Sequence, residues 1–246
     1  GDLHVHTDAS ADAQSSLDEM AEEAARLGRR YLAITDHSRS RPLGITGDQL
    51  HEHCDAIWRT HLAHRGELHL LTGLEVDILP DGSLDLPPRD LAGLDCVVAS
   101  VHSHFAMSRD EMTARIVRAL RSGVVHILGH PTGRQIGARP PYDFDLELVL
   151  AVARQMGVAL EVNAMPDRLD LTDSACRLAK EAGVKLVINS DAHNTSHLGN
   201  LRYGVWVARR GWLEKEDVLN TLPLDALRRF WRARREQAEG PAAPGP

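Results

Sequence analysis

Residues 96–130 read CVVASVHSHFAMSRDEMTARIVRALRSGVVHILGH, which is a strand, a helix and a second strand in succession. The apolar runs Cys96–Val101 and Val124–Leu128 have the length and the β-branched content of buried strands. Between them, Arg109–Arg121 carries apolar residues at helical spacing. This order predicts two parallel strands joined by a helical crossover.

The same alternation extends in both directions along the chain. Further strand-like runs are Asp2–Thr7, Tyr31–Thr35, His69–Ile78, Ala159–Val162, Lys185–Ile188 and Tyr203–Val207. Further helical patterns are Leu17–Leu27, Asp48–His64, Leu146–Met156, Asp173–Ala182, Glu214–Asn220 and Asp225–Arg235. About seven such units without a linker favour a single α/β barrel, although the alternation alone also fits an open doubly wound sheet.

Composition excludes several classes of protein. Of the 246 residues, 43% are apolar and 26% are charged, which is ordinary for a globular chain and excludes disorder over most of it. No apolar run approaches the roughly 18 residues of a membrane span. Three distant cysteines without a CxxC pair predict reduced thiols and a cytoplasmic protein. The Pro/Gly/Ala stretch 240–246 is expected to be a disordered tail after a domain at 1–239.

Histidine, with 14 residues, outnumbers Phe, Tyr and Trp combined. His4 and His6 form an HxH pair, and the period-2 alternation of a strand puts both on one face. Other donors follow the ends of predicted strands across the whole chain. The full set is His4, His6, Asp12, His37, Glu75, His102, His130, Asp191 and His193. In an α/β barrel the carboxyl ends of the strands are where active sites are built.

Imidazole and carboxylate groups are ligands for divalent Zn, Mn, Fe and Ni. One ion needs three or four protein groups, so this set suits two or three ions that share a bridging carboxylate. Such a cluster lowers the pKa of water from about 15.7 towards 7 and clamps the oxygens of a phosphoryl group. The sequence therefore predicts metal-dependent phosphoester chemistry without a side-chain nucleophile.

The alternative to metal binding is that any one strand-end histidine is a hydrogen-bonded structural residue. An HxH pair alone is a weak signal of a metal site. The joint occurrence of nine donors carries the prediction. The other histidines receive the structural interpretation. His51, His53, His61 and His64 are expected on a solvated helix face, and His69 and His126 as ordinary strand residues. For His104 and His197 both interpretations stay open.

Six short runs, in this order, resemble the PHP (polymerase and histidinol phosphatase) superfamily. They are Gly1-Asp-Leu-His-Val-His-Thr, Ile34-Thr-Asp-His, Gly73-Leu-Glu-Val-Asp, Ser100-Val-His, Leu128-Gly-His-Pro and Asn189-Ser-Asp-Ala-His. Longer runs, such as Gly129-His-Pro-Thr-Gly-Arg and Asn163-Ala-Met-Pro-Asp-Arg-Leu-Asp-Leu, are most similar to the carboxyl-terminal PHP domain of bacterial family X DNA polymerases.

The resemblance implies a distorted (β/α)7 TIM-like barrel that holds three divalent metal ions. The first ion would take His4, His6, Glu75 and Asp191. Glu75 would bridge to a second ion completed by His102 and His130, and the third would take Asp12, His37 and His193. We assign catalytic roles to Glu75, Asp191 and His102. Asp12 departs from the histidine of some family members, and its hard oxygen favours Mn slightly, with Zn or Fe as alternatives.

The resemblance also implies an Mn-dependent 3′–5′ exonuclease or DNA-end repair nuclease. DNA would be the partner, as 3′ ends or as single-stranded, gapped or abasic-site DNA, and the protein would associate with the nucleoid during repair. The resemblance implies a covalently linked polymerase domain before Gly1, and a start without methionine fits the expectation that the chain is a fragment of a longer protein. One alternative is a small-molecule phosphomonoesterase of the histidinol-phosphatase type. The other is a non-catalytic structural module of a polymerase.

Two arginines are candidates for substrate phosphate. Arg134 follows His130 by four residues, and Arg168 lies just past the strand that ends near Asn163. A guanidinium group suits bidentate phosphate contact, while a surface ion pair is the competing interpretation. The arginines of the last helix are expected on a solvated face. No aromatic platform for stacking unpaired bases is visible in the sequence.

Overall fold

The computed structural model describes residues 1–239, so the predicted tail at 240–246 lies outside the described residues. Seven parallel strands follow one another around a single sheet in chain order. They are β1 (Asp2–Val5), β2 (Tyr31–Ile34), β3 (His69–Asp77), β4 (Cys96–Ser100), β5 (Ile127–Leu128), β6 (Ala159–Asn163) and β7 (Leu186–Asn189). This order is that of a barrel and excludes the doubly wound sheet, in which the strand order reverses.

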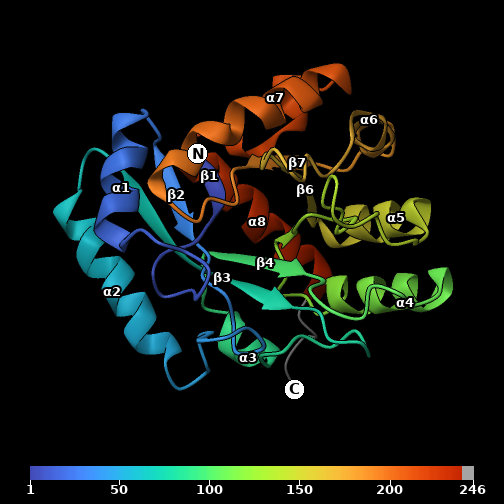
Figure 1. Ribbon diagram of the computed structural model, residues 1–246, viewed down its shortest axis with the longest axis horizontal. Coiled ribbons are helices and arrows are strands. Elements are labelled where there is room, and N and C mark those ends of the chain that lie inside the picture. The colour runs from blue at the N-terminus through green and yellow to red at the C-terminus, as the bar shows by residue number, and fades with distance from the viewer. Residues whose placement is uncertain (240–246) are drawn as a thin grey trace, which may run out of the picture.

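Eight α-helices are described, and all but the last lie around the outside of the strands (Figure 1). They are α1 (Leu17–Arg26), α2 (Leu50–Ala63), α3 (Pro88–Leu91), α4 (Arg109–Leu120), α5 (Leu146–Met156), α6 (Asp173–Glu181), α7 (Leu201–Arg210) and α8 (Leu224–Glu239). Two of them begin with capping boxes, Ser16 with Glu19 and Ser108 with Glu111. Gly157 ends α5 in the left-handed conformation, with φ of 60°, that glycine adopts without strain.

Side chains complete the seam between β1 and β7. Asn189 Oδ1 accepts a hydrogen bond from Leu3 N at 3.1 Å, and Asp2 Oδ1 accepts one from Ser190 N at 3.1 Å. A backbone bond from His6 N to Ala192 O, 2.8 Å long, follows just beyond the strands. The seven strands therefore form a nearly closed barrel, which confirms the predicted distorted (β/α)7 architecture.

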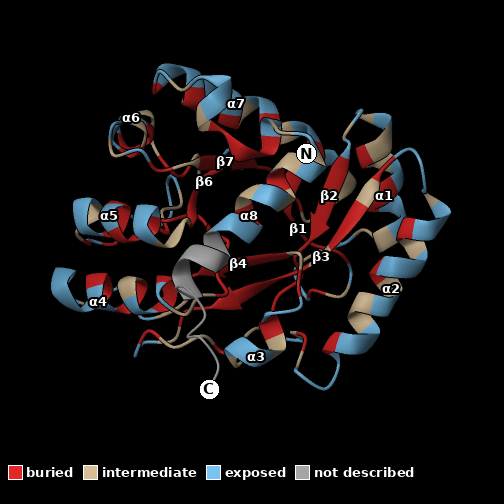
Figure 2. Cartoon of the chain, turned by 180° about the vertical axis from the view of Figure 1, so that it is seen from behind, coloured by how far each residue is buried: buried red, intermediate tan, exposed pale blue. Residues whose placement is uncertain are grey.

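Helix α8 crosses one end of the barrel (Figure 2). Its Leu227 and Trp231 pack against the inner layer of the strands, which includes Leu3, Leu71 and Val98. Arg228 Nη2 lies 3.0 Å from Nε2 of His69, the first residue of β3, so α8 covers the amino ends of the strands. The carboxyl ends, where the predicted donors lie, are left for the functional site.

Two predicted elements were wrong. Tyr203–Val207 was expected as a strand but lies within α7, because its alternating apolar residues mimic a strand. The buried residues Leu201, Gly204 and Ala208 recur at helical spacing instead. Glu214–Asn220 was expected as a helix but forms two 3₁₀ turns, Lys215–Asp217 and Leu219–Thr221. Short elements such as α3 were not predicted.

The expected solvated histidine face on α2 was also wrong in part. His51 is exposed, but His61 is buried against the ring of His69 at 4.2 Å between centroids. The side chain of His53 is 8% exposed and directs Nε2 toward Asp36 at 3.9 Å. A polar helix face that lies against a polar neighbour looks the same in sequence as one that faces water.

Among residues 1–239, the helices are too short or too polar to span a bilayer.

Candidate metal centre

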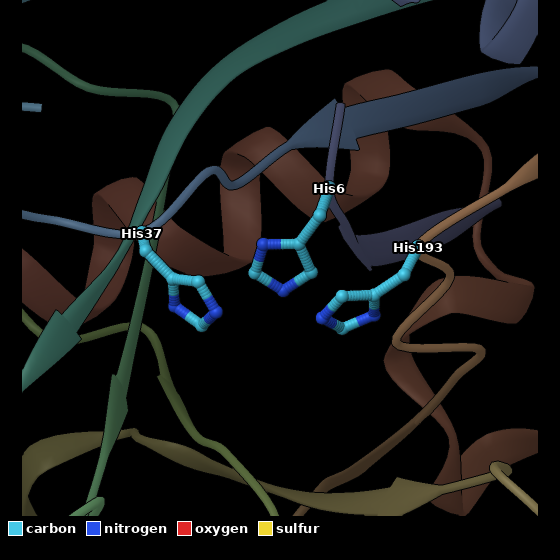
Figure 3. Close-up of side chains that lie close together, drawn as sticks. All are labelled: His6, His37 and His193. Atoms are coloured by element: carbon cyan, nitrogen blue, oxygen red, sulfur yellow. The ribbon is translucent and has the colours of Figure 1, made fainter. Parts of the chain in front are cut away.

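All nine predicted donors gather at the carboxyl ends of the strands, on β1 and β3 or on the segments that follow β1, β2, β4, β5 and β7. His6, His37 and His193 come from three different loops, and Figure 3 shows their rings converging on a common space. Three triads bring donor atoms within 4.8 Å of one another: His6, His37 and His193; His4, His6 and Glu75; His37, Glu75 and His102.

Glu75, on β3, lies in the middle of this centre and is 1% exposed. Its Oε1 faces ring nitrogens of three histidines, namely His130 at 3.0 Å, His102 at 3.3 Å and His4 at 3.4 Å. Its Oε2 faces His37 Nδ1 at 2.9 Å and His6 Nε2 at 3.5 Å. One carboxylate thus lies between the two groups of imidazoles, the position that a bridging ligand requires.

Asp191 is the second buried carboxylate. Its Oδ1 faces three imidazoles, His6 at 3.2 Å, His4 at 3.5 Å and His193 at 3.7 Å. Its Oδ2 accepts a hydrogen bond from Asn163 Nδ2 at 2.9 Å and lies 3.5 Å from Arg168 Nε. The fold therefore fixes one oxygen of Asp191 and directs the other into the cluster.

Asp12 marks the solvent side of the centre, with a side chain that is 44% exposed. Its Oδ2 lies 3.3 Å from His37 Nε2 and 3.7 Å from His193 Nε2. Hydrogen bonds from His193 and His37 lower the pKa of Asp12. Asp12 and His193, whose side chain is 21% exposed, are the most exposed of the nine donors.

Groups of the fold fix the orientation of three rings. Each of these histidines donates its Nδ1 hydrogen to an oxygen: His4 to Glu161 Oε1 at 2.8 Å, His102 to Asp77 Oδ1 at 2.6 Å, and His193 to the carbonyl of Asp191 at 2.8 Å. A neutral imidazole with a proton on Nδ1 presents a lone pair at Nε2. All three Nε2 lone pairs then point into the centre.

This geometry brings hydrogen-bond acceptors face to face in a buried space. The lone pair of His4 Nε2 lies 3.4 Å from Glu75 and 3.5 Å from Asp191, both of which only accept when ionised. Among the groups of residues 1–233, whose side chains are described, the Nε2 atoms of His4 and His6 and Nδ1 of His37 are buried without a hydrogen-bond partner. Positive charge between these groups stabilises such an arrangement, and a set of imidazole and carboxylate donors fits divalent metal ions.

The charges around the centre shift the pKa values of the rings in two directions. Burial alone would lower the pKa of His4, but the carboxylates of Glu161, Asp191 and Glu75 raise it well above its usual value, and neighbouring acids also raise the pKa of His37, His102 and His193. Burial, helped by the charge of His37, lowers the pKa of His6 to about 3. Burial and the nearby Arg168 lower the pKa of His130 to about 4. Burial alone would raise the pKa of Glu75, but His102, His4 and His37 together bring it well below its usual value. Ionised carboxylates beside neutral imidazoles are the forms that bind a metal ion.

Sequence reasoning missed the residues that support these donors. Glu161 on β6 is fully buried and accepts hydrogen bonds from His4 Nδ1 and, at 2.6 Å, from His130 N. Asp77 supports His102, and Asn163 supports Asp191. The available signal was a carboxylate inside an apolar strand, in Ala159–Asn163, where an unpaired charge would be costly.

The two candidate phosphate-binding arginines occupy different positions. Arg168 lies at the centre, with Nε 3.5 Å from Asp191 and a buried Nη1 that has no hydrogen-bond partner among the described side chains of residues 1–233. Arg134 donates Nε to the carbonyl of Arg168 at 2.7 Å and Nη2 to the carbonyl of Leu169. Arg134 therefore holds the segment that carries Arg168.

The remaining histidines near the motifs are now placed. His104 is exposed, with φ of 54°, on the loop after β4. His197 Nδ1 accepts a hydrogen bond from His193 N at 3.3 Å, so it supports the backbone of a centre residue. His126 is buried, its Nδ1 accepts a hydrogen bond from Val97 N at 3.0 Å, and its ring packs on Trp231.

Comparison with known proteins places this centre in a family. Residues 2–165 match the PHP domain family. The DNA polymerase/3′-5′ exonuclease PolX of Bacillus subtilis is 42% identical over 94% of this chain, which spans only 40% of that relative. A probable phosphatase of Thermoanaerobacter sp. is 31% identical over 89% of both chains.

A solved structure shares the fold. The histidinol phosphate phosphatase of Lactococcus lactis, in complex with Zn, L-histidinol and phosphate, superposes with a TM-score of 0.65 over 87% of this chain and 94% of that one. Its sequence is 18% identical to this chain, so the likeness is one of fold. The resemblance expected from the short motifs is confirmed by the family match and the two relatives, and this chain belongs to the PHP domain family.

Proposed function

We propose that this chain hydrolyses phosphodiesters at the 3′ ends of DNA, as a 3′–5′ exonuclease or DNA-end repair nuclease. The broader class, a metal-dependent phosphoesterase, follows from membership of the PHP family. The observation that carries the proposal is Glu75, a buried carboxylate that faces five imidazoles at 2.9–3.5 Å. The 42% identity to PolX of Bacillus subtilis supports DNA as the substrate.

The proposed ligands are the nine predicted donors in three groups. The first is His4, His6, Glu75 and Asp191, the second is Glu75, His102 and His130, and the third is Asp12, His37 and His193. Divalent ions held there, Mn or alternatively Zn or Fe, would lower the pKa of water and neutralise charge on a phosphoryl group. Within this set, Glu75, Asp191 and His102 are the proposed catalytic residues.

The chain's own residues prepare the site for a phosphate. The guanidinium of Arg168 lies beside Oδ2 of Asp191, and its Nη1, which has no hydrogen-bond partner among the described side chains, can bind a non-bridging phosphate oxygen. Glu161, Asp77 and Asn163 hold the donors in place, so little reorganisation is needed when a substrate binds.

End-labelled single-stranded and gapped oligonucleotides, incubated with Mn-loaded protein, test the proposal. We expect stepwise release of nucleotides from the 3′ end, abolished by chelation and restored by Mn. If protein with verified metal content released no nucleotide, the nuclease would be excluded.

A phosphomonoesterase is the second candidate, because the probable phosphatase of Thermoanaerobacter sp. matches 89% of both chains. A preference for p-nitrophenyl phosphate over DNA, compared as kcat/KM, would favour it.

The non-catalytic module is the third candidate, and all nine proposed positions carry side chains able to bind a metal. Less than one ion per chain after reconstitution with Mn or Zn would favour that module.

A further inference from the structure

Three successive rim loops form a connected wall beside the candidate centre. The loop after β5 is tied to the loop after β6, because Ile136 N donates to Asp167 O at 2.5 Å and Arg134 Nε donates to Arg168 O at 2.7 Å. The loop after β4 joins this wall through Phe105, three residues past His102. Three residues span at most about 10 Å, so the wall stands next to the centre.

Within this wall, Phe105, Arg139 and Tyr142 form a stack. The guanidinium carbon of Arg139 lies 3.9 Å from the centroid of the Phe105 ring. The ring of Tyr142 is nearly parallel to that of Phe105, at 16° and 6.2 Å between centroids, and its hydroxyl donates to Pro131 O at 2.7 Å. Phe105 therefore lies against both the ring of the buried Tyr142 and the guanidinium of Arg139.

The Arg139 side chain is held by the loop itself. Its Nε donates to the carbonyl of Gly133 at 2.8 Å. Gly133 has φ of 61°, and a Cβ there would lie 2.5 Å from Cε1 of Tyr142. Only glycine allows the loop to pack this closely on the ring, and that close packing brings the Gly133 carbonyl to the arginine.

Arg139 lacks the usual partner of a half-buried cation. Among the side chains of residues 1–233, no carboxylate forms an ion pair with Arg139, and within that range Nε is its single hydrogen-bonding nitrogen. Burial and, to a lesser extent, the positive charge of Arg168 lower the pKa of Arg139. This effect of Arg168 indicates that the two guanidinium groups lie near each other. A purely structural arginine at such a place would be expected to pair with an acid.

We propose that Arg139, stacked on Phe105, is the platform for the base of the nucleotide whose phosphate lies at the centre. The inference rests on the proposed nuclease and gives it a specificity-determining residue. Bases stack on guanidinium planes and aromatic rings at about 1–3 kcal/mol each, without preference for one base. The sequence shows no platform, because Phe105 and Arg139 come from different loops.

Two oligonucleotides that differ only at the 3′ terminus separate stacking from phosphate binding. One ends in a normal nucleotide and the other in an abasic tetrahydrofuran residue with the same phosphate. We expect Mn-loaded protein to remove the normal nucleotide with a kcat/KM about 10-fold higher. Arg139→Lys keeps the charge but loses the flat surface, and Phe105→Leu keeps the apolar volume. Each variant should bring the ratio of kcat/KM between the normal and the abasic oligonucleotide close to one.

Arg202→Lys is the matched control, because Arg202 lies 4.8 Å above the ring of Tyr203 on the outer helix α7. It should leave the ratio unchanged. An independent readout is calorimetric binding of dAMP against 2-deoxyribose 5-phosphate to the same metal-loaded proteins. We expect dAMP to bind about 10-fold more tightly in the wild type and in Arg202→Lys alone.

The platform would be overturned if Arg139→Lys and Phe105→Leu lowered kcat/KM equally for both oligonucleotides. It would also be overturned if the wild type cleaved both with the same kcat/KM. Either result would leave the proposed nuclease intact. If neither oligonucleotide is cleaved by metal-loaded wild type, the nuclease fails, and the binding ratio of dAMP to the sugar phosphate still decides on the platform.

Discussion

Glu161 Oε1 lies 2.8 Å from Nδ1 of His4, with both residues fully buried. The same carboxylate accepts hydrogen bonds from His130 N at 2.6 Å and from the side-chain amides of Asn163 at 3.2 Å and Asn189 at 2.9 Å. Every one of these neighbours is a donor. Glu161 therefore acts as an acceptor only, and it determines which nitrogen of His4 faces Glu75 and Asp191.

Glu161→Gln should weaken metal binding without unfolding the protein. A glutamine replaces one acceptor oxygen by an amide that must face a donor, which disturbs the orientation of His4. Loss of such a supporting group costs about 10- to 100-fold in metal affinity. Competition titration of Mn against a chelator would measure it.

Glu22→Gln, on the exposed face of α1, is the control and should bind Mn as the wild type does. Asp77→Asn should weaken a different ion, because Asp77 supports His102. Unchanged Mn affinity in Glu161→Gln would show that the contact with His4 does not position a ligand.

Asp191→Ala and His4→Ala should each remove metal and activity while the fold persists. Both residues lie at the carboxyl ends of strands, outside the clusters of buried apolar side chains that hold the barrel together. Metal content would be read by elemental analysis and the fold by circular dichroism. Global unfolding of both variants would contradict the view that this rim is built for function.

Much of this architecture could be predicted from local patterns. The seven strands were expected because each is a short apolar run between helices with helical periodicity, and the predicted donors mark strand ends. Helix α7 could not be recognised, since Tyr203–Val207 alternates like a strand and only the packing of Gly204 on β7 shows a helix. Glu161 was missed for a related reason, because three of its four donors, on His4, His130 and Asn189, come from segments distant in sequence.

Gly204→Ala tests that packing. A Cβ at this position would lie 2.5 Å from Cγ2 of Ile188 and 3.0 Å from Cβ of Ala164, so the helix and the barrel must separate. Although alanine favours helices, such overpacking costs about 1–3 kcal/mol of unfolding free energy. Chemical denaturation would measure the loss. A variant as stable as the wild type would mean that α7 does not contact β7 this closely.

Asp170 should make the protein less stable as the pH rises from about 4 to 6. Burial raises its pKa from 3.8 to about 6, despite hydrogen bonds from Thr132. Below pH 4 the folded and unfolded chains both hold the proton. Between pH 4 and 6 only the folded chain keeps it, so unfolding becomes easier, and the full penalty of about 3 kcal/mol applies above pH 6.

Asp170→Asn removes this penalty, because an amide does not ionise and can still accept the hydrogen bond from Thr132 N, which is 2.9 Å long in the wild type. The difference in unfolding free energy between variant and wild type should therefore grow with pH across this window. Denaturant titrations at several pH values, with chelator in both samples, would measure it. Parallel pH curves would show that Asp170 ionises normally.

Arg134 and Arg168 should act on phosphate through one contact. Arg168 faces Asp191, and Arg134 hydrogen-bonds to the carbonyls of Arg168 and Leu169. Arg168→Ala should lower kcat/KM for any phosphoester about 10- to 100-fold, the value of a charged hydrogen bond, at unchanged metal content. Arg134→Ala should have a smaller effect, because it loosens the segment that carries Arg168.

The double variant distinguishes positioning from direct contact. If Arg134 acts only by holding Arg168, then Arg134→Ala adds nothing once Arg168 is already alanine, and the two effects are strongly non-additive. If each guanidinium binds its own phosphate oxygen, the two losses multiply. Kinetics on a DNA 3′ end and on p-nitrophenyl phosphate would both report the cycle, because the backbone hydrogen bonds of Arg134 do not depend on what the phosphate is attached to.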